Sequence, residues 1–105
     1  MSADIGVAVF VKTSALSPVK TRLASAIGQQ AALQVFRASV SCLRSSVSLA
    51  SQRCSLQPYW AVAEAAGVSA WGDWPTLVQT SGDLGARMAD IYQQLRMRHR
   101  GAVLL

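Results

Sequence analysis

Side chains that bind anions follow the first apolar segment of the chain, residues 5–11. Lys12 comes directly after this segment, and Lys20, Thr21 and Arg22 follow a short loop. An arginine offers a fork of donors to two phosphate oxygens, and a lysine supplies a point charge. The pattern therefore predicts a phosphate site, with a solvated basic loop as the alternative. The chain contains neither a Walker A motif nor a G-x-G-x-x-G motif.

The segment 79–88 is a second place where a ligand could bind. Gly82 and Gly85 allow a ligand to approach the backbone closely. A helix pattern follows, and the open N–H groups at a helix N-terminus form an anion site. Asp83 has the right chemistry to cap that helix, so a purely capping role is the alternative.

These two loops are expected at the ends of strands, because strand and helix patterns alternate along the chain. Apolar, β-branched or aromatic runs predict strands at residues 5–12, 59–63, 76–79 and 102–105. A short helical turn is expected to end at Gly28. A long helix then begins at Gln29, with its apolar residues three and four apart. Residues 51–58 are expected to form a loop, and residues 64–75 an irregular segment with one helical turn.

The last helix pattern begins after Asp83 and is predicted to end at Gly101.

The alternation of strand and helix patterns indicates an α/β fold with a mostly parallel sheet and flanking helices, in which ligands bind at the carboxyl ends of the strands. Only two helices of useful length are available to cover that sheet. We therefore expect residues 1–105 to be the N-terminal part of a single, truncated domain, with an unpaired sheet edge through which it could self-associate.

Composition sets the class of protein. The 105 residues are 51% hydrophobic and carry a formal net charge of +5, which indicates a globular chain with a preference for anionic partners. The same excess would also arise in a fragment that lacks the acidic residues of its other half. The basic residues are scattered and match no nucleic-acid motif, so nucleic acid is not the expected partner.

Several other site types are disfavoured. The two cysteines form no C-x-x-C motif and, with a single histidine, no zinc cluster. His99 lies among arginines and is expected on the surface. The three tryptophans could stack a base, although core packing is the commoner role. The first apolar run is too short to cross a membrane and lacks signal-peptide flanks, which predicts a cytoplasmic protein without membrane contact.

Four short segments together resemble a known group of proteins. They are Val9-Phe-Val-Lys12, Ser17-Pro-Val-Lys-Thr-Arg-Leu-Ala24, Tyr59-Trp-Ala-Val-Ala-Glu64 and Gly82-Asp-Leu-Gly-Ala-Arg-Met88. In this order they resemble the uncharacterised DUF2064 family, which is similar to glycosyltransferase-A enzymes and to MobA-like and CofC-like nucleotidyltransferases. The chain departs from the family pattern at Ser14-Ala15, where a Pro-Gly pair is expected, and at Thr80-Ser81, where a glycine is common.

The resemblance implies a Rossmann-like domain of the glycosyltransferase-A type with a nucleotide or nucleotide-sugar pocket. It implies that Lys12, Lys20 and Arg22 face the phosphates. Residues that would border the base or ribose are Gln79, Gly82, Asp83, Gly85 and Arg87. It also implies Mg²⁺ or Mn²⁺ in the complete domain, held by an aspartate that would lie beyond Leu105.

The implied activity is transfer from a nucleoside triphosphate or nucleotide-sugar, with cations stabilising the departing phosphate. No residue stands out as a general base, and we expect little or no catalysis from these 105 residues alone. One alternative is a non-catalytic nucleotide-binding remnant of a truncated transferase. A second is a basic nucleic-acid-binding module, whose affinity would fall steeply with salt.

Overall fold

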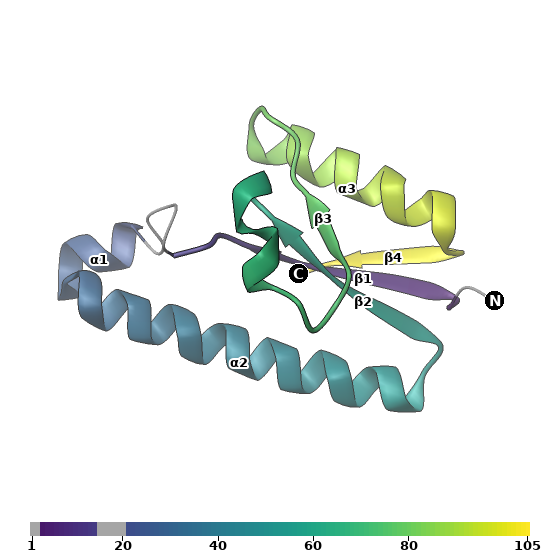
Figure 1. Cartoon of the computed structure of the whole chain (residues 1–105), viewed down its shortest axis with the longest axis horizontal. Helices are drawn as coiled ribbons and strands as arrows, with labels where there is room; N and C mark the ends of the chain where they lie inside the picture. Colours follow the sequence, from purple (N-terminus) through teal and green to yellow (C-terminus); the bar gives the residue numbers. More distant parts are fainter. Residues whose placement is uncertain (1–2, 15–20) are drawn as a thin grey trace.

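A four-stranded parallel sheet forms the centre of the molecule (Figure 1). The computed structural model describes residues 3–14 and 21–105. The strands are β1 (Ile5–Val11), β2 (Leu56–Val62), β3 (Thr76–Val78) and β4 (Gly101–Leu104), in the spatial order β3-β2-β1-β4. The helices are α1 (Thr21–Ile27), α2 (Gln29–Arg53) and α3 (Leu84–Arg98), with a short 3₁₀ helix, η1 (Ala65–Ala70). The predicted α/β class with a parallel sheet is confirmed.

The direction in which the chain moves across the sheet reverses at β1. The connection through α2 leads from β1 to β2 on one side, whereas α3 leads from β3 across to β4 on the other. Right-handed crossovers in opposite directions place their helices on opposite faces of a sheet. The two helices accordingly pack on opposite faces, α2 over one and α3 over the other.

Strand β1 is buried on both faces because it lies inside this sandwich. Val7, Val9 and Val11 belong to the core under α2, and Ala8 belongs to the core under α3. Side chains of successive strand residues point to opposite faces, so a strand covered on both sides needs apolar residues at every position. This explains the nearly continuous apolar run from which the strand was predicted.

Helix α2 is much longer than the strand it covers. Its 25 residues span about 37 Å, whereas the seven residues of β1 span about 23 Å. The first part of α2 therefore projects past the carboxyl ends of the strands, where α1 packs against it (Figure 1). Gly28 joins the two helices with a φ of 92°, a left-handed value that favours glycine. The predicted break at this residue is confirmed.

The expected loop at residues 51–58 is wrong. Helix α2 continues to Arg53 and β2 begins at Leu56, so Pro58 lies inside a strand. The backbone N–H of Trp60 donates to the carbonyl oxygen of Pro75, so it points toward the β3 side of the strand. Backbone N atoms two residues apart in a strand point the same way, and the N atom of Pro58 therefore also faces the β3 side. Because β3 pairs only with residues 60–62, the proline faces an open stretch of edge and removes no ladder hydrogen bond.

Two expectations at the end of α3 are also wrong. The helix ends at Arg98, and Gly101 is the first residue of β4, not a helix terminator. His99 is buried, not on the surface, with only 8% of its area exposed. Its Nδ1 lies 2.7 Å from the Ala3 carbonyl oxygen and its Nε2 lies 2.7 Å from the Tyr59 hydroxyl. Each ring nitrogen thus has a hydrogen-bond partner, so burial leaves no polar atom of the imidazole unsatisfied.

Candidate functional site

A depression of about 280 Å³ lies at the carboxyl ends of the strands, on the side of the sheet that α3 covers. Lys12 follows β1, Gln79 follows β3, and Arg87 comes from the first turns of α3. The residues that line it are Phe10, Val11, Lys12, Phe36, Gln79, Leu84 and Arg87. Two cations thus flank a largely apolar hollow at the edge where parallel sheets bind ligands.

Lys12 is the more accessible of the two cations. It is exposed, and it forms no hydrogen bond or ion pair within the described residues. Strand alternation sends it to the same face as Phe10, away from α2. Its ammonium group is therefore available to an incoming anion without loss of an existing contact.

Gln79 ties the strand ends together. Its Nε2 donates to the Ala61 carbonyl oxygen at 2.8 Å, and its backbone N–H donates to Val62 at 2.9 Å. Its Oε1 accepts a hydrogen bond of 3.2 Å from Nη1 of Arg87. The amide is thus used within the protein, and its effect on the depression is to position Arg87.

Asp83 caps α3. Its Oδ1 accepts from the backbone N–H of Ala86 at 2.8 Å, and Gly82 precedes it with a φ of 118°. The predicted cap is confirmed. The carboxylate already occupies an open donor of the first turn, so it competes with any anion at this helix N-terminus. Gly85 lies exposed in the same turn, and neither glycine lines the depression.

Thr21 and Arg22, two further residues of the predicted phosphate group, do not join Lys12 at this depression. Lys20 lies outside the described residues. Thr21 and Arg22 are exposed at the start of α1, and neither lines the hollow. Of the nine residues singled out from the sequence, the structure brings together Lys12, Gln79 and Arg87.

The anchoring of the loop after β1 was not predicted from the sequence. The backbone N–H of Thr13 donates to Oε1 of Glu64 at 2.9 Å, and Trp71 donates its indole N–H to Oγ1 of Thr13 at 3.0 Å. Both partners come from the segment after β2, which packs so closely that a Cβ added at Gly67 would overlap Thr13. No local pattern in the sequence signals contacts between residues so far apart.

The described residues do not fit a Mg²⁺ or Mn²⁺ site. Within residues 3–14 and 21–105, no three carboxylate, histidine or cysteine side chains come together around a common point. The expected divalent metal therefore has no assigned ligands in this part of the chain.

Over the same residues, no helix has the length and apolar character needed to span a bilayer.

Comparison of the chain with protein-family models, with curated protein sequences and with solved structures gives no significant match.

Proposed function

We propose that the chain is the nucleotide-binding part of a transferase domain, and that the depression beside α3 holds the phosphates of a nucleoside triphosphate or nucleotide-sugar. The observation that carries the proposal is the meeting of Lys12 and Arg87 at the carboxyl ends of β1 and β3. Open parallel sheets bind their ligands at this edge, and two cations on an apolar hollow favour an anionic group. The resemblance of the sequence to glycosyltransferase-A enzymes and nucleotidyltransferases supports the same ligand class.

The two cations would act in different ways. Arg87 is partly buried and held by Gln79, so its guanidinium is oriented before a ligand arrives. Lys12 is exposed and adjustable, so it can follow a flexible phosphate chain. Preorganised charge of this kind stabilises a negative group without reorganisation during binding. No step of the proposal passes through a metal ion, because the described residues offer no ligand set for one.

Calorimetric titration with UTP, GTP, CTP and ATP at constant ionic strength tests the proposal. We expect at least one triphosphate to bind and its free nucleoside to bind far more weakly. Lys12→Ala should reduce the affinity by roughly tenfold, because a hydrogen bond to a charged group is lost. Arg87→Ala should have a similar or larger effect.

Arg53→Ala is the matched control, because Arg53 is exposed at the far end of α2 and its loss changes the net charge equally. Equal binding by Lys12→Ala and the wild type would remove the basis of the assignment. Preference for oligonucleotides with a steep salt dependence would favour the nucleic-acid module instead. Turnover that depends on Mg²⁺ or Mn²⁺ would separate the transferase from the non-catalytic remnant.

A further inference from the structure

A second depression lies on the other side of the sheet, under α2. Its volume is about 290 Å³. Phe36 of α2 lines both hollows. The residues that give the second hollow its chemistry are Thr13, Ser14, Arg37, Arg44 and Trp71. None of the four polar ones among them belongs to the depression beside α3.

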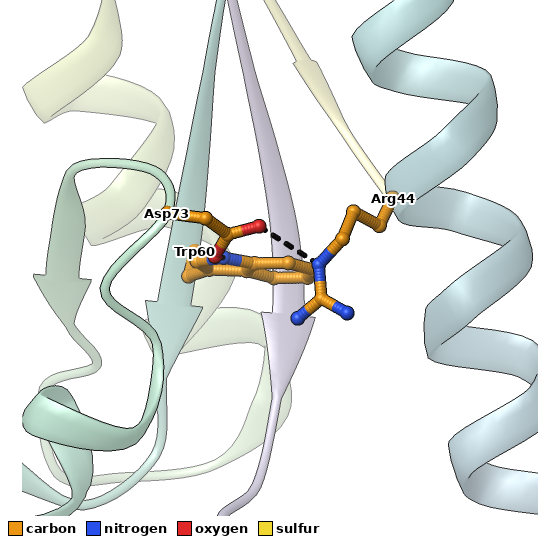
Figure 2. Close-up of polar contacts among 3 residues, drawn as sticks. All are labelled: Arg44, Trp60 and Asp73. Atoms are coloured by element: carbon orange, nitrogen blue, oxygen red, sulfur yellow. Dashed lines mark hydrogen bonds and ion pairs between the residues drawn. The ribbon is translucent and has the colours of Figure 1, made fainter.

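Arg44 is held in place by two neighbours (Figure 2). Its Nε lies 2.8 Å from Oδ2 of Asp73, and its guanidinium lies 5.2 Å from the centre of the Trp60 ring. Asp73 is itself fixed, because its Oδ1 accepts from the indole N–H of Trp60 at 2.8 Å. The contact uses Nε, and both Nη groups point away from the carboxylate in Figure 2. They therefore remain available as a fork of donors.

Arg37 supplies charge that is not neutralised by the protein. It lies seven residues before Arg44, which places both arginines on one face of α2. Arg37 is exposed and makes no ion pair or hydrogen bond with any residue that the structure describes. Asp73 balances the charge of Arg44, so Arg37 leaves this hollow with a positive excess.

The loop after β1 adds hydroxyl groups to the opposite wall. Oγ1 of Thr13 accepts the indole N–H of Trp71, so its own proton is free to donate elsewhere. The backbone of Thr13 is fixed by Glu64, which keeps that hydroxyl in position. Ser14 is exposed and borders the same hollow. Donors thus approach from two turns of a helix and from a separate loop.

We propose that this hollow is a second ligand site and binds the phosphate group of a small molecule. A tetrahedral phosphate presents oxygens in several directions, which suits donors from a helix and a loop better than a planar carboxylate does. The apolar side chains of Phe36, Val40 and Trp71 would contact the rest of that molecule. The site stands independently of the nucleotide proposal, because its charged residues differ from Lys12 and Arg87.

Tryptophan fluorescence during titration with inorganic phosphate tests this site. Chloride keeps the ionic strength constant. The fluorescence should respond to a bound ligand because Trp71 lines the hollow and the guanidinium of Arg44 lies over the Trp60 ring. We expect a saturable change in the wild-type protein. Arg37→Ala should weaken binding by roughly tenfold or more, because a charged donor to the anion is lost. Glycerol 3-phosphate should bind at least as tightly as inorganic phosphate, and glycerol should not bind.

The controls separate this site from the depression beside α3. Arg53→Ala should bind phosphate like the wild type, because Arg53 is exposed at the far end of α2 and lines neither depression. Arg44→Lys keeps the charge but loses the fork, and we expect weaker binding with the fold retained. The absence of a saturable change in the wild type would overturn the proposal. So would equal affinity in Arg37→Ala, or loss of binding in Lys12→Ala alone.

Discussion

The two faces of the sheet are built in different ways, although both border the same carboxyl ends. Under α3 the core contains the aliphatic side chains of Ile91 and Leu95, both fully buried. Under α2 the core contains aromatic rings: Trp60 stacks on Trp74 with ring centres 4.2 Å apart, and Trp71 lies 4.8 Å from Trp60 with its ring tilted by 51°. The second arrangement brings polar indole N–H groups into the core, and each of them needs a partner.

This difference decides where polar side chains hold the molecule together. On the α2 face, the indole N–H of Trp60 donates to Asp73 in the segment before β3, and the indole N–H of Trp71 donates to Thr13 in the loop after β1. On the α3 face, the corresponding polar pair is Tyr59 with His99, which ties the chain to Ala3 before β1 begins. The hydrogen bond to Thr13 thus orders the α2 face at the carboxyl ends of the strands, whereas the Tyr59–His99 pair orders the α3 face at the opposite edge.

Removal of the central ring should have the largest effect. Trp60→Ala deletes a fully buried side chain and is expected to lower the free energy of unfolding by about 3–5 kcal/mol. Leu95→Ala opens a smaller cavity at a fully buried position on the α3 face and should lower the free energy of unfolding by about 2–5 kcal/mol. Urea unfolding followed by circular dichroism measures both. We expect Trp60→Ala to lose more stability, because Trp74, Asp73 and Arg44 all contact that ring. A larger loss of stability in Leu95→Ala would reverse the comparison.

A single methyl group at Gly67 should disturb the ordered edge of the α2 face. A Cβ at this buried position would overlap Oγ1 of Thr13, so the loop after β1 must move. Gly67→Ala should therefore cost about 1–3 kcal/mol of stability and shift the fluorescence of Trp71, which bonds the same hydroxyl. Gly72→Ala is the control, because no atom lies within 4 Å of a Cβ there. Equal stability of the two variants would show that this packing is not restrictive.

The smallest expected effect comes from Asp73. Burial alone would raise its pKa, but hydrogen bonds from Trp60 and from the backbone, together with the charge of Arg44, hold the pKa below its ordinary value of 3.8. The unfolded chain therefore takes up this proton at a higher pH than the folded chain. The charged Asp73 carboxylate therefore stabilises the folded chain. This contribution is complete above the ordinary pKa and is lost as the pH falls through the lowered pKa.

Asp73→Asn should remove this acid dependence. We expect the difference in free energy of unfolding between wild type and variant to be constant near neutral pH and to shrink below about pH 4. The difference should be small, because the ion pair of Asp73 with Arg44 is exposed to solvent. Urea unfolding at pH values on both sides of the ordinary pKa provides the measurement. A gap that widened on acidification would contradict the sign of the shift.

The elements that follow local patterns were predictable. The buried strand β1, the break at Gly28, the long helix α2 and the cap at Asp83 all follow from residues near to one another in the chain. Spacing and capping chemistry act within a few residues, so they can be read without knowing the fold. The boundaries of β2 were missed, because a proline is compatible with a strand only where the sheet edge is open.

The candidate sites were only partly predictable. Lys12, Gln79 and Arg87 were singled out from their loops, and the fold brings them together. Thr21 and Arg22 were expected beside Lys12, yet they begin a helix that packs on α2. Arg37 and Arg44 have the period of an ordinary solvated helix face. Only the packing of α2 against the loop after β1 gives them a common ligand-sized hollow.

The sequence by itself determined the α/β class, the central strand and the capped helix beside the first depression, because these depend on short-range periodicity and backbone chemistry. Tertiary structure alone decided that His99 is buried and that Arg44, Trp60 and Asp73 meet. It also decided which loop residues face α2 and which face α3. These outcomes depend on strand order and on the face each crossover helix covers, and such long-range pairings leave no local signal in the chain.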